Sequence, residues 1–351
     1  MKPQLNDLLA DPIGKGSLTM EVDEATESEV ISGSLSTDDG KTYPIKRGIP
    51  RFVTTEDEDQ LQTRDAFAFK WGKRDTYDSE GSRNMTTTWL VDKYGFESAD
   101  DWASYYNSRE RILDVGCGGG FSSSLWLRND HWTGKGAWVG TDISEAVDVA
   151  AARLSHIPNT HFVQGDALSL PFPDASFDTV FSEGVLHHTP STRNALHDAA
   201  RVLAPEGEIQ FYVYRQKGPV REFTDDHIRH AISDLPEEEA WDAMRSLTEL
   251  GRSLSELDTT IELKSDIPLL GIPAGTHDVQ RLVYWHFAKL YWNADLTFEE
   301  NVHINYDWYR PHYAHRHTAE EVKTWCSEAS LEIDRFHEQE AGFTVRAMKR
   351  G

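Results

Sequence analysis

The sequence of 351 residues contains only two cysteines, Cys117 and Cys326, and this scarcity excludes two kinds of site. A disulfide framework needs several cysteine pairs. A structural zinc site built on thiolates needs about four nitrogen or sulfur ligands close together. We therefore expect no disulfide scaffold, no cysteine metal site and no bound metal.

Long apolar segments are also missing from the chain. No apolar run reaches the roughly 18 residues that a membrane-spanning helix needs. The first residues, Met1 to Asp7, lack the apolar stretch of a secretory signal. We therefore expect a cytoplasmic protein that makes no membrane contact.

Basic residues are few compared with acidic ones. The chain has 35 Lys and Arg against 59 Asp and Glu, which gives a formal net charge of −24. Proteins that bind nucleic acids need basic patches to neutralise phosphates, so this balance argues against a nucleic-acid partner and favours a small-molecule substrate. A salty habitat or a need for solubility would explain the excess of acid equally well.

The most informative segment present is residues 111–120, where apolar residues lead into a glycine-rich loop. Ile112, Leu113 and Val115 are typical of a buried parallel strand. Glycines allow positive backbone φ angles and let a ligand approach the backbone closely. Asp114 lies at the strand end, where a carboxylate can meet a positively charged ligand. The spacing Asp-x-Gly-x-Gly-Gly-Gly differs from the Gly-x-Gly-x-x-Gly of nicotinamide enzymes.

Further strand-like and helix-like segments alternate after this loop. The strand-like segments are 137–142, 161–166, 177–182 and 208–214, and the helix-like ones are 144–154 and 190–203. The second helix is expected to begin with Thr189 as its cap. This alternation predicts an α/β fold with a doubly wound parallel sheet. Asp142 and Asp166 stand at the ends of the first two of these strands.

The order of these features resembles class I S-adenosylmethionine-dependent methyltransferases with a methyltransferase type 11-like core. The resemblance implies a Rossmann-like sheet and S-adenosyl-L-methionine as the cofactor. It also implies that Asp142 binds the ribose hydroxyls, that Asp166 accepts from the adenine amine and that the Ala167 amide faces the ring. The expected cofactor-binding residues in the core are Asp114, Gly116, Gly118, Gly119, Asp142, Ile143, Asp166, Ala167 and Ser182.

Residues 67–71 lie where such methyltransferases place a helix over the cofactor. Phe69 and Trp71 are expected to cover the sulfonium, since aromatic faces attract cations. Ordinary packing of this helix against the core is the alternative interpretation.

The chain is expected to divide into four parts. Residues 1–55 resemble a small zinc-ribbon-like domain that has lost its cysteines, with a role in packing on the catalytic domain or in contact between two copies of the chain. Residues 56–108 form a helical, aromatic connector over the cofactor. Residues 109–215 and 318–351 form the methyltransferase core, which ends in a helix and two strands, the last one antiparallel. Residues 216–317 form a helical, substrate-binding insertion between the fifth and sixth strands of that core.

The insertion contains two segments that suggest a substrate pocket. Residues 278–292 carry apolar side chains around the whole circumference of a predicted helix, as expected for a helix that is buried or lines a cavity. Residues 303–317 are dense in polar, aromatic and titratable groups. We expect the acceptor pocket between this second segment and the loop after the fourth strand. The candidate substrate-binding residues are Tyr284, Tyr306, Tyr309 and Arg310, the last suited to a carboxylate or phosphate.

The predicted activity is transfer of a methyl group to a polar small molecule, with oxygen favoured over nitrogen or sulfur as the acceptor atom. The candidate general bases are His187, His188, Asp307 and His315. The histidines of residues 303–317 could instead bind a metal or make structural hydrogen bonds. Protein or RNA methylation, or a non-catalytic cofactor-binding scaffold, are the alternative functions.

Overall fold

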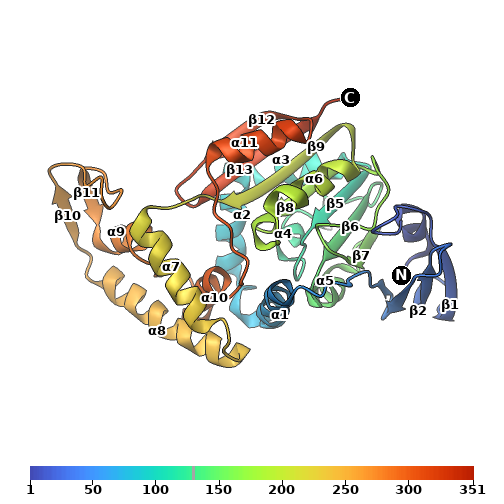
Figure 1. Cartoon of the computed structure of the whole chain (residues 1–351), viewed down its shortest axis with the longest axis horizontal. Helices are drawn as coiled ribbons and strands as arrows, with labels where there is room; N and C mark the ends of the chain where they lie inside the picture. Colours follow the sequence, from blue (N-terminus) through green and yellow to red (C-terminus); the bar gives the residue numbers. More distant parts are fainter. Residues whose placement is uncertain (129–130) are drawn as a thin grey trace.

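A computed structural model describes residues 1–128 and 131–351, and its centre is a seven-stranded sheet (Figure 1). The strand order is β12-β13-β9-β8-β5-β6-β7. The bounds are β5 Arg111–Val115, β6 Ala137–Asp142, β7 Thr160–Gln164, β8 Phe177–Glu183, β9 Leu203–Tyr214, β12 Leu331–Glu338 and β13 Gly342–Lys349. Strands β5 to β9 pair in parallel, whereas β13 is antiparallel to both β9 and β12. The predicted α/β, Rossmann-like fold with an antiparallel last strand is therefore confirmed.

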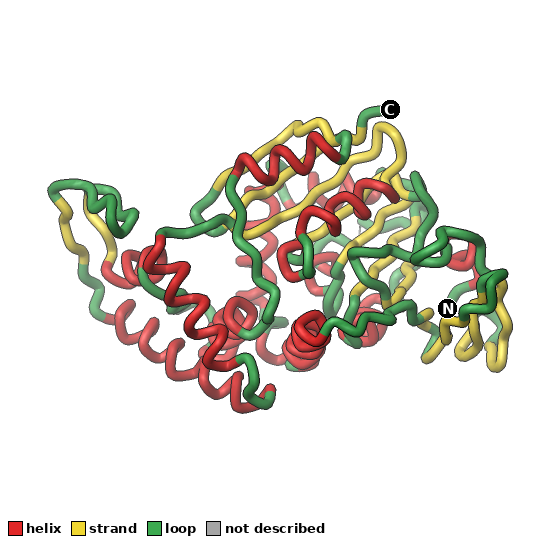
Figure 2. Tube along the Cα trace, viewed as in Figure 1, coloured by secondary structure: helices red, strands yellow, loops and turns green. Residues whose placement is uncertain are grey.

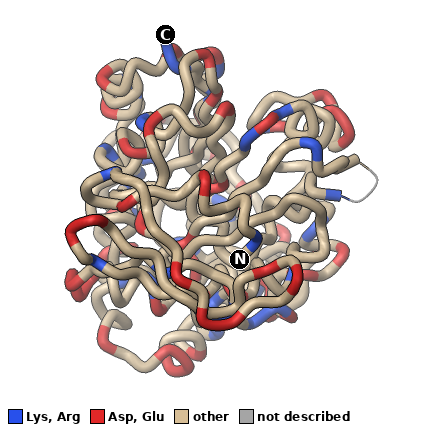
Figure 3. The backbone as a smooth tube through the Cα atoms, turned by 90° about the vertical axis from the view of Figure 1, so that its right-hand side faces the viewer, with Lys and Arg blue, Asp and Glu red and all other residues tan. Residues whose placement is uncertain are grey.

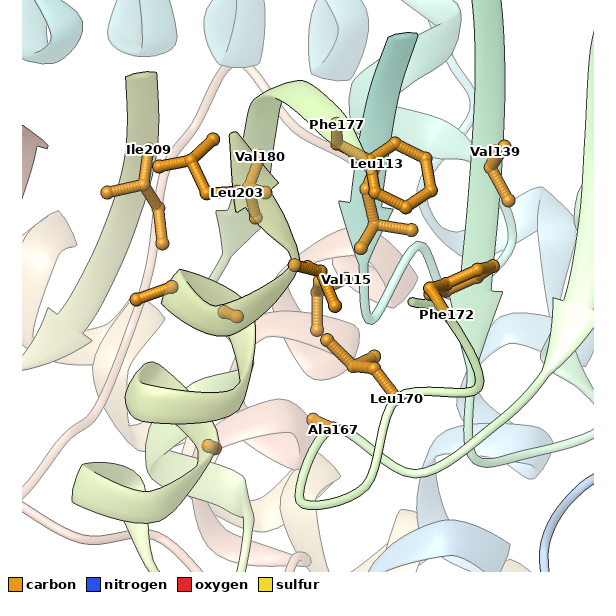
Figure 4. Packing of buried hydrophobic residues seen from close by; sticks show 14 of the residues in the cluster. Leu113, Val115, Val139, Ala167, Leu170, Phe172, Phe177, Val180, Leu203 and Ile209 are labelled. Carbon is orange, nitrogen blue, oxygen red and sulfur yellow. The ribbon is translucent and has the colours of Figure 1, made fainter. Parts of the chain in front are cut away.

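Helices cover both faces of this sheet. Those of the core and its connector are α1 Glu58–Gly72, α2 Glu80–Tyr94, α3 Ala99–Asn107, α4 Phe121–Ser124, α5 Ala146–Leu154, α6 Thr192–Val202 and α11 Ala319–Glu328. Because successive side chains of a strand point to opposite faces, β5 contributes to two cores. Leu113 and Val115 pack on the side of α6, as Figure 4 shows, while Ile112 packs with α2, α3 and α5.

Two predicted helices have different bounds in the structure. Helix α6 begins at Thr192 because Ser191 accepts a hydrogen bond from the Asn194 amide and so serves as its cap. The predicted cap, Thr189, instead donates its hydroxyl to the Leu186 carbonyl. Helix α11 begins at a capping box in which Thr318 is the cap and Glu321 the reciprocal partner.

The apolar segment 278–292 is helical only over α9, Val279–His286, and is irregular beyond it. The amides of Lys289 and Tyr291 donate to the Tyr309 hydroxyl and the Asn305 side chain, both on α10 (Phe298–Tyr309). These contacts with a neighbouring helix replace the bonds that would continue α9.

The insertion lies between β9 and α11 and extends away from the sheet at the left of Figure 2. Besides α9 and α10 it contains α7 Pro219–Ile232, α8 Glu237–Glu256, β10 Thr260–Leu263 and β11 Gly275–Asp278, the last two paired as a hairpin.

Across the described residues, no helix combines the length and the apolar character needed to cross a membrane.

The N-terminal part is a four-stranded antiparallel sheet with β1 Thr19–Ala25, β2 Val30–Ser36, β3 Thr42–Lys46 and β4 Ile49–Pro50. Where the resemblance would place a cysteine knuckle, Asp11 accepts hydrogen bonds from the Gly14 amide and the Tyr43 hydroxyl, at 2.6 and 2.7 Å. Hydrogen bonds therefore hold this turn. The relation to zinc ribbons and the division of the chain into four parts remain predictions.

Candidate active site

A cavity of about 550 Å³ lies at the carboxyl ends of the parallel strands, where ligands commonly bind in open α/β sheets. The sheet side of its wall contains Val115, Gly116, Asp142, Ile143, Gly165, Asp166, Ala167, Glu183, Gly184 and Val185. Residues of α1, α2, α7, α9 and α10 form much of the rest of the wall. The connector and the insertion thus cover this edge of the sheet.

The glycine loop after β5 is shaped by close contacts that admit no side chain. Gly116 has φ 73°, and a Cβ added there would lie 2.2 Å from a methyl carbon of Val185. Gly118 has φ 51°, and its added Cβ would lie 2.5 Å from the indole nitrogen of Trp71. Trp71 therefore lies across the loop and lines the cavity, whereas Phe69 packs against Trp241 outside the cavity wall.

Asp142 lies in the cavity wall with its carboxylate held by three donors. The amide and hydroxyl of Ser144 donate to Oδ1 at 2.8 and 2.6 Å, and the Gly118 amide donates to Oδ2 at 2.9 Å. Burial raises the pKa of Asp142. A carboxylate oxygen can accept two hydrogen bonds, so Oδ2 can accept one more from a ligand in the cavity.

Asp166 is held in a similar way at the end of β7. Its Oδ1 accepts from the Leu168 amide and its Oδ2 from the Gln60 side chain of α1, each at 2.9 Å. Burial raises the pKa of Asp166. The amide of Ala167, also in the cavity wall, donates no hydrogen bond to a residue of the described chain, which leaves it free for a ligand.

Four other predicted cofactor residues, Asp114, Gly118, Gly119 and Ser182, lie outside the cavity wall. Asp114 is buried beneath the loop and accepts from the Ser123 hydroxyl at 2.5 Å. Burial raises its pKa to about 7. Ser182 donates to the Val115 carbonyl at 3.1 Å, and Gly119 lies in the loop away from the cavity. The predicted direct contact of Asp114 with a cationic ligand is therefore corrected to support of the loop.

His188 is the histidine among the predicted bases that lines the cavity. Its Nδ1 lies 2.6 Å from the carbonyl oxygen of Tyr313, and a carbonyl only accepts, so Nδ1 carries the hydrogen. The buried Nε2 therefore keeps a free lone pair and has no partner in the described chain. Burial lowers the pKa of His188 to about 4, so the ring is neutral at pH 7.

His187 and His315 do not line the cavity. His187 is fully buried, with its ring centre 3.7 Å from that of Tyr214. The His315 amide donates to the His187 carbonyl at 2.9 Å, so the two residues join the loop after β8 to the segment after α10. The structure corrects both predicted bases to supporting positions.

The remaining histidines of the predicted cluster have separate partners. His303 contacts the Thr76 hydroxyl at 2.8 Å, His317 contacts the Thr192 hydroxyl at 2.9 Å, and His312 lies 3.3 Å from a carboxylate oxygen of Asp59. Within residues 1–128 and 131–351, no group of three or more acidic, histidine or cysteine side chains is arranged to hold a metal ion.

Asp307 lines the cavity and forms an ion pair with Lys70 of α1. Burial alone would raise the pKa of Asp307, but the charge of Lys70 outweighs this and holds the pKa well below its usual range. A carboxylate with so low a pKa is a weak proton acceptor, so the predicted role of Asp307 as a base is less suitable than that of His188.

Of the four predicted substrate-binding residues, Tyr284 lines the cavity and the others do not. Arg310 binds Glu237 at 2.9 Å and donates to carbonyls at the end of α7, while the Tyr306 hydroxyl donates to the same Glu237. The Tyr309 hydroxyl donates to Asp225 at 3.0 Å.

Helical periodicity explains this correction. Residues three and four apart share a helix face, so Ile304, Asp307 and Trp308 face the cavity together while their neighbours face α7 and α8.

Sequence reasoning missed several residues of the cavity wall: Lys70, Met85, Trp89, Lys217, Arg221, Arg281, Trp285, Lys289 and Trp308. The sequence could have indicated Lys289 as a site residue, because it is the only charged residue in the apolar run 287–292. A charged residue is rarely buried without a reason. The others lie in ordinary amphipathic segments, and only the tertiary structure brings them together.

Comparison with known proteins agrees with this geometry. Residues 113–211 match the family model described as a methyltransferase domain. An uncharacterized methyltransferase, YcgJ of Bacillus subtilis, is 30% identical over 181 residues, which cover 48% of this chain and 68% of that protein. Phthiotriol/phenolphthiotriol dimycocerosates methyltransferase 1 of Mycobacterium ulcerans is 31% identical over 132 residues, covering 38% of this chain and 48% of the relative. The chain thus spans about half the length of this mycobacterial relative.

Among solved structures, N-methyltransferase NodS of Bradyrhizobium japonicum, bound to S-adenosylhomocysteine, aligns with a TM-score of 0.43 at 14% identity. The alignment covers 83% of this chain and 100% of that one. The sheet order, the glycine loop and the relatives lead to one conclusion. The chain belongs to the class I S-adenosylmethionine-dependent methyltransferases.

Proposed function

We propose that this enzyme methylates a polar small molecule, with oxygen as the favoured acceptor atom and nitrogen or sulfur as alternatives. A cavity of about 550 Å³ between the sheet and the insertion is in the size range of small-molecule sites. The net charge of −24 makes RNA an unfavourable substrate.

The residues after β5, β6 and β7 fit S-adenosylmethionine, which supplies an activated methyl group on a sulfonium. The backbone of Gly116 lies in the cavity wall, and Asp142 Oδ2 can accept from a ribose hydroxyl. The Ala167 amide and the Asp166 carboxylate stand together where an adenine needs one donor and one acceptor. Trp71 also lines the cavity, and its ring, which has Nζ of Lys70 at 4.2 Å from its centre, attracts cations.

The observation that carries the choice of acceptor is the tautomer of His188. An alcohol becomes a good nucleophile when a base removes its proton, and an imidazole nitrogen with a free lone pair can accept that proton. Nε2 of His188 has this lone pair because Nδ1 donates to Tyr313. His188 therefore acts as the general base for a hydroxyl acceptor bound in the cavity.

Calorimetric titration with S-adenosylmethionine and S-adenosylhomocysteine is the first test, and one-to-one binding is the expected result. A panel of alcohols, amines and thiols is then screened for release of S-adenosylhomocysteine. Turnover confined to alcohols supports the proposal. Turnover confined to amines or thiols, or only with RNA or protein, would overturn the choice of acceptor.

A further inference from the structure

The end of the cavity formed by the insertion contains a cluster of cations around two aromatic rings. The Nζ atoms of Lys289 and Lys217 lie 4.7 and 5.9 Å from the ring centre of Trp308, and the guanidinium carbon of Arg221 lies 5.4 Å from it. The guanidinium carbons of Arg221 and Arg281 each lie 5.4 Å from the ring centre of Tyr284. All six residues line the cavity.

Only one of these four cations is neutralised by a carboxylate in the described part of the chain. Arg221 pairs with buried Asp225, with Nε at 2.8 Å from each oxygen. Lys289 donates to the Ile304 carbonyl at 3.2 Å, and Lys217 donates to backbone carbonyls that include Arg215.

The remaining cation, Arg281, likewise makes no ion pair within residues 1–128 and 131–351. The one acid in this part of the wall, Asp307, is already paired with Lys70.

The burial of Lys289 makes this arrangement costly without a ligand. Lys289 is 7% exposed. An ammonium group that is buried away from water and has no paired counter-ion is strongly destabilised. Burial lowers the pKa of both Lys289 and Lys217 to about 7. An anion in the cavity would supply the missing negative charge.

We propose that this cation cluster, Lys217, Arg221, Arg281 and Lys289, binds an anionic oxygen group, a carboxylate or a phosphate, on the methyl acceptor. The proposal rests on the proposed function and names the substrate class of the same site. The aromatic side chains beside the cluster favour an acceptor with a flat apolar body: Tyr284, Trp285, Tyr291 and Trp308 line this end of the cavity.

The rest of the molecule makes the cluster distinctive. Acidic positions are spread along much of the backbone trace in Figure 3, and the chain carries 24 more acidic than basic residues. Three of these four cations, Lys217, Arg281 and Lys289, have no carboxylate partner among the described residues, so the cluster is a local property of the cavity and not a consequence of overall composition. Electrostatic complementarity of this kind selects charged ligands over neutral analogues.

The test uses the full-length protein saturated with S-adenosylhomocysteine and four probes: benzoate, benzamide, phenyl phosphate and inorganic phosphate. Dissociation constants are measured by ligand-observed NMR, and the probes are also titrated into the protein without S-adenosylhomocysteine. Benzoate or phenyl phosphate should bind at least about fivefold more tightly than benzamide, as expected for a charge-assisted contact. The tighter of the two identifies the anionic group, and inorganic phosphate reports the contribution of the anion without a ring.

Lys289→Met should remove this preference for anionic probes. Arg281→Met should reduce the preference, and Arg281 is exposed, so its replacement is tolerated by the fold. Lys264→Met, at an exposed lysine outside the cavity, is the matched control and should leave it unchanged. Equal binding of benzoate, phenyl phosphate and benzamide, or a preference unchanged in both cavity variants, would overturn the inference. S-adenosylhomocysteine binding is scored separately, so its loss would count against the proposed function and not against the anion site.

Discussion

Nδ1 of His188 lies 2.6 Å from the carbonyl oxygen of Tyr313, and this single hydrogen bond joins two parts of the chain 125 residues apart. It connects the loop after β8 to the segment after α10, at the end of the insertion. It also fixes the ring tautomer, so that Nε2 is the atom available as a base. The proposed role of His188 as a general base thus depends on a contact with the insertion.

Replacing His188 with Gln should lower turnover of a hydroxyl acceptor by roughly 10²- to 10⁴-fold, the usual contribution of a general base. Affinity for S-adenosylhomocysteine should change little, because the cofactor contacts lie elsewhere in the wall. Steady-state kinetics and calorimetry measure the two quantities. His315→Gln is the matched control, and equal loss in both variants would show that His188 acts only through packing.

The rate of the unmodified enzyme should not change through His188 titration between about pH 6 and 8. Burial lowers the pKa of His188 to about 4, so the neutral base form is already complete in this range and is lost only as the pH falls toward 4. A pH profile of kcat/KM on a hydroxyl acceptor tests this. An acid limb near pH 6.5 that disappears in His188→Gln would contradict the buried, neutral ring.

Asp142→Ala should weaken cofactor binding by about 1–3 kcal/mol, which corresponds to roughly 5- to 150-fold in Kd. The variant loses the carboxylate that meets the ligand and also the contact that orders the Gly118 amide. Calorimetry with S-adenosylhomocysteine gives the value, and exposed Asp242→Ala serves as the control. Unchanged affinity would remove Asp142 from the site.

Lys70→Met should destabilise the fold by about 3–5 kcal/mol, because it leaves the Asp307 carboxylate without its buried partner. The double variant with Asp307→Asn should recover part of this loss. The pair holds the pKa of Asp307 low, so its contribution is present above about pH 4 and is lost as the pH falls below that value. Urea denaturation of the variants provides the measurement, and additive losses in the double variant would argue against coupling.

Asp114→Asn should make stability less dependent on pH. Burial raises the folded-state pKa of Asp114 to about 7, so its favourable protonated form is lost as the pH rises through 7. Between pH 5 and 8 this costs the unmodified protein about 2–3 kcal/mol of unfolding free energy. Denaturation at both pH values should show a smaller difference for the variant, and an equal difference would mean that Asp114 is ionised when folded.

The alternation of strands and helices carried most of the information about the fold. Buried parallel strands such as β5 are almost continuously apolar and end in glycine or acid, and these local patterns fix both the element and its place at the sheet edge. The resemblance to class I methyltransferases, which rests on these strand ends, implied cofactor roles for Asp142, Asp166 and Ala167, and all three line the cavity. Helix ends were less certain, since several residues before α6 are capable of capping it.

The sequence by itself thus determined the α/β class, the parallel strands alternating with helices and the cofactor edge of the sheet, because local patterns along the chain specify them. The tertiary structure alone decided which face of α10 meets the cavity: it excluded Tyr306 and Arg310 from the wall, kept the predicted Asp307 and added Trp308. It also decided that Lys289 reaches the cavity beside Trp308. Such pairings depend on how helices of the insertion rotate against one another, and side-chain packing between distant segments sets that rotation.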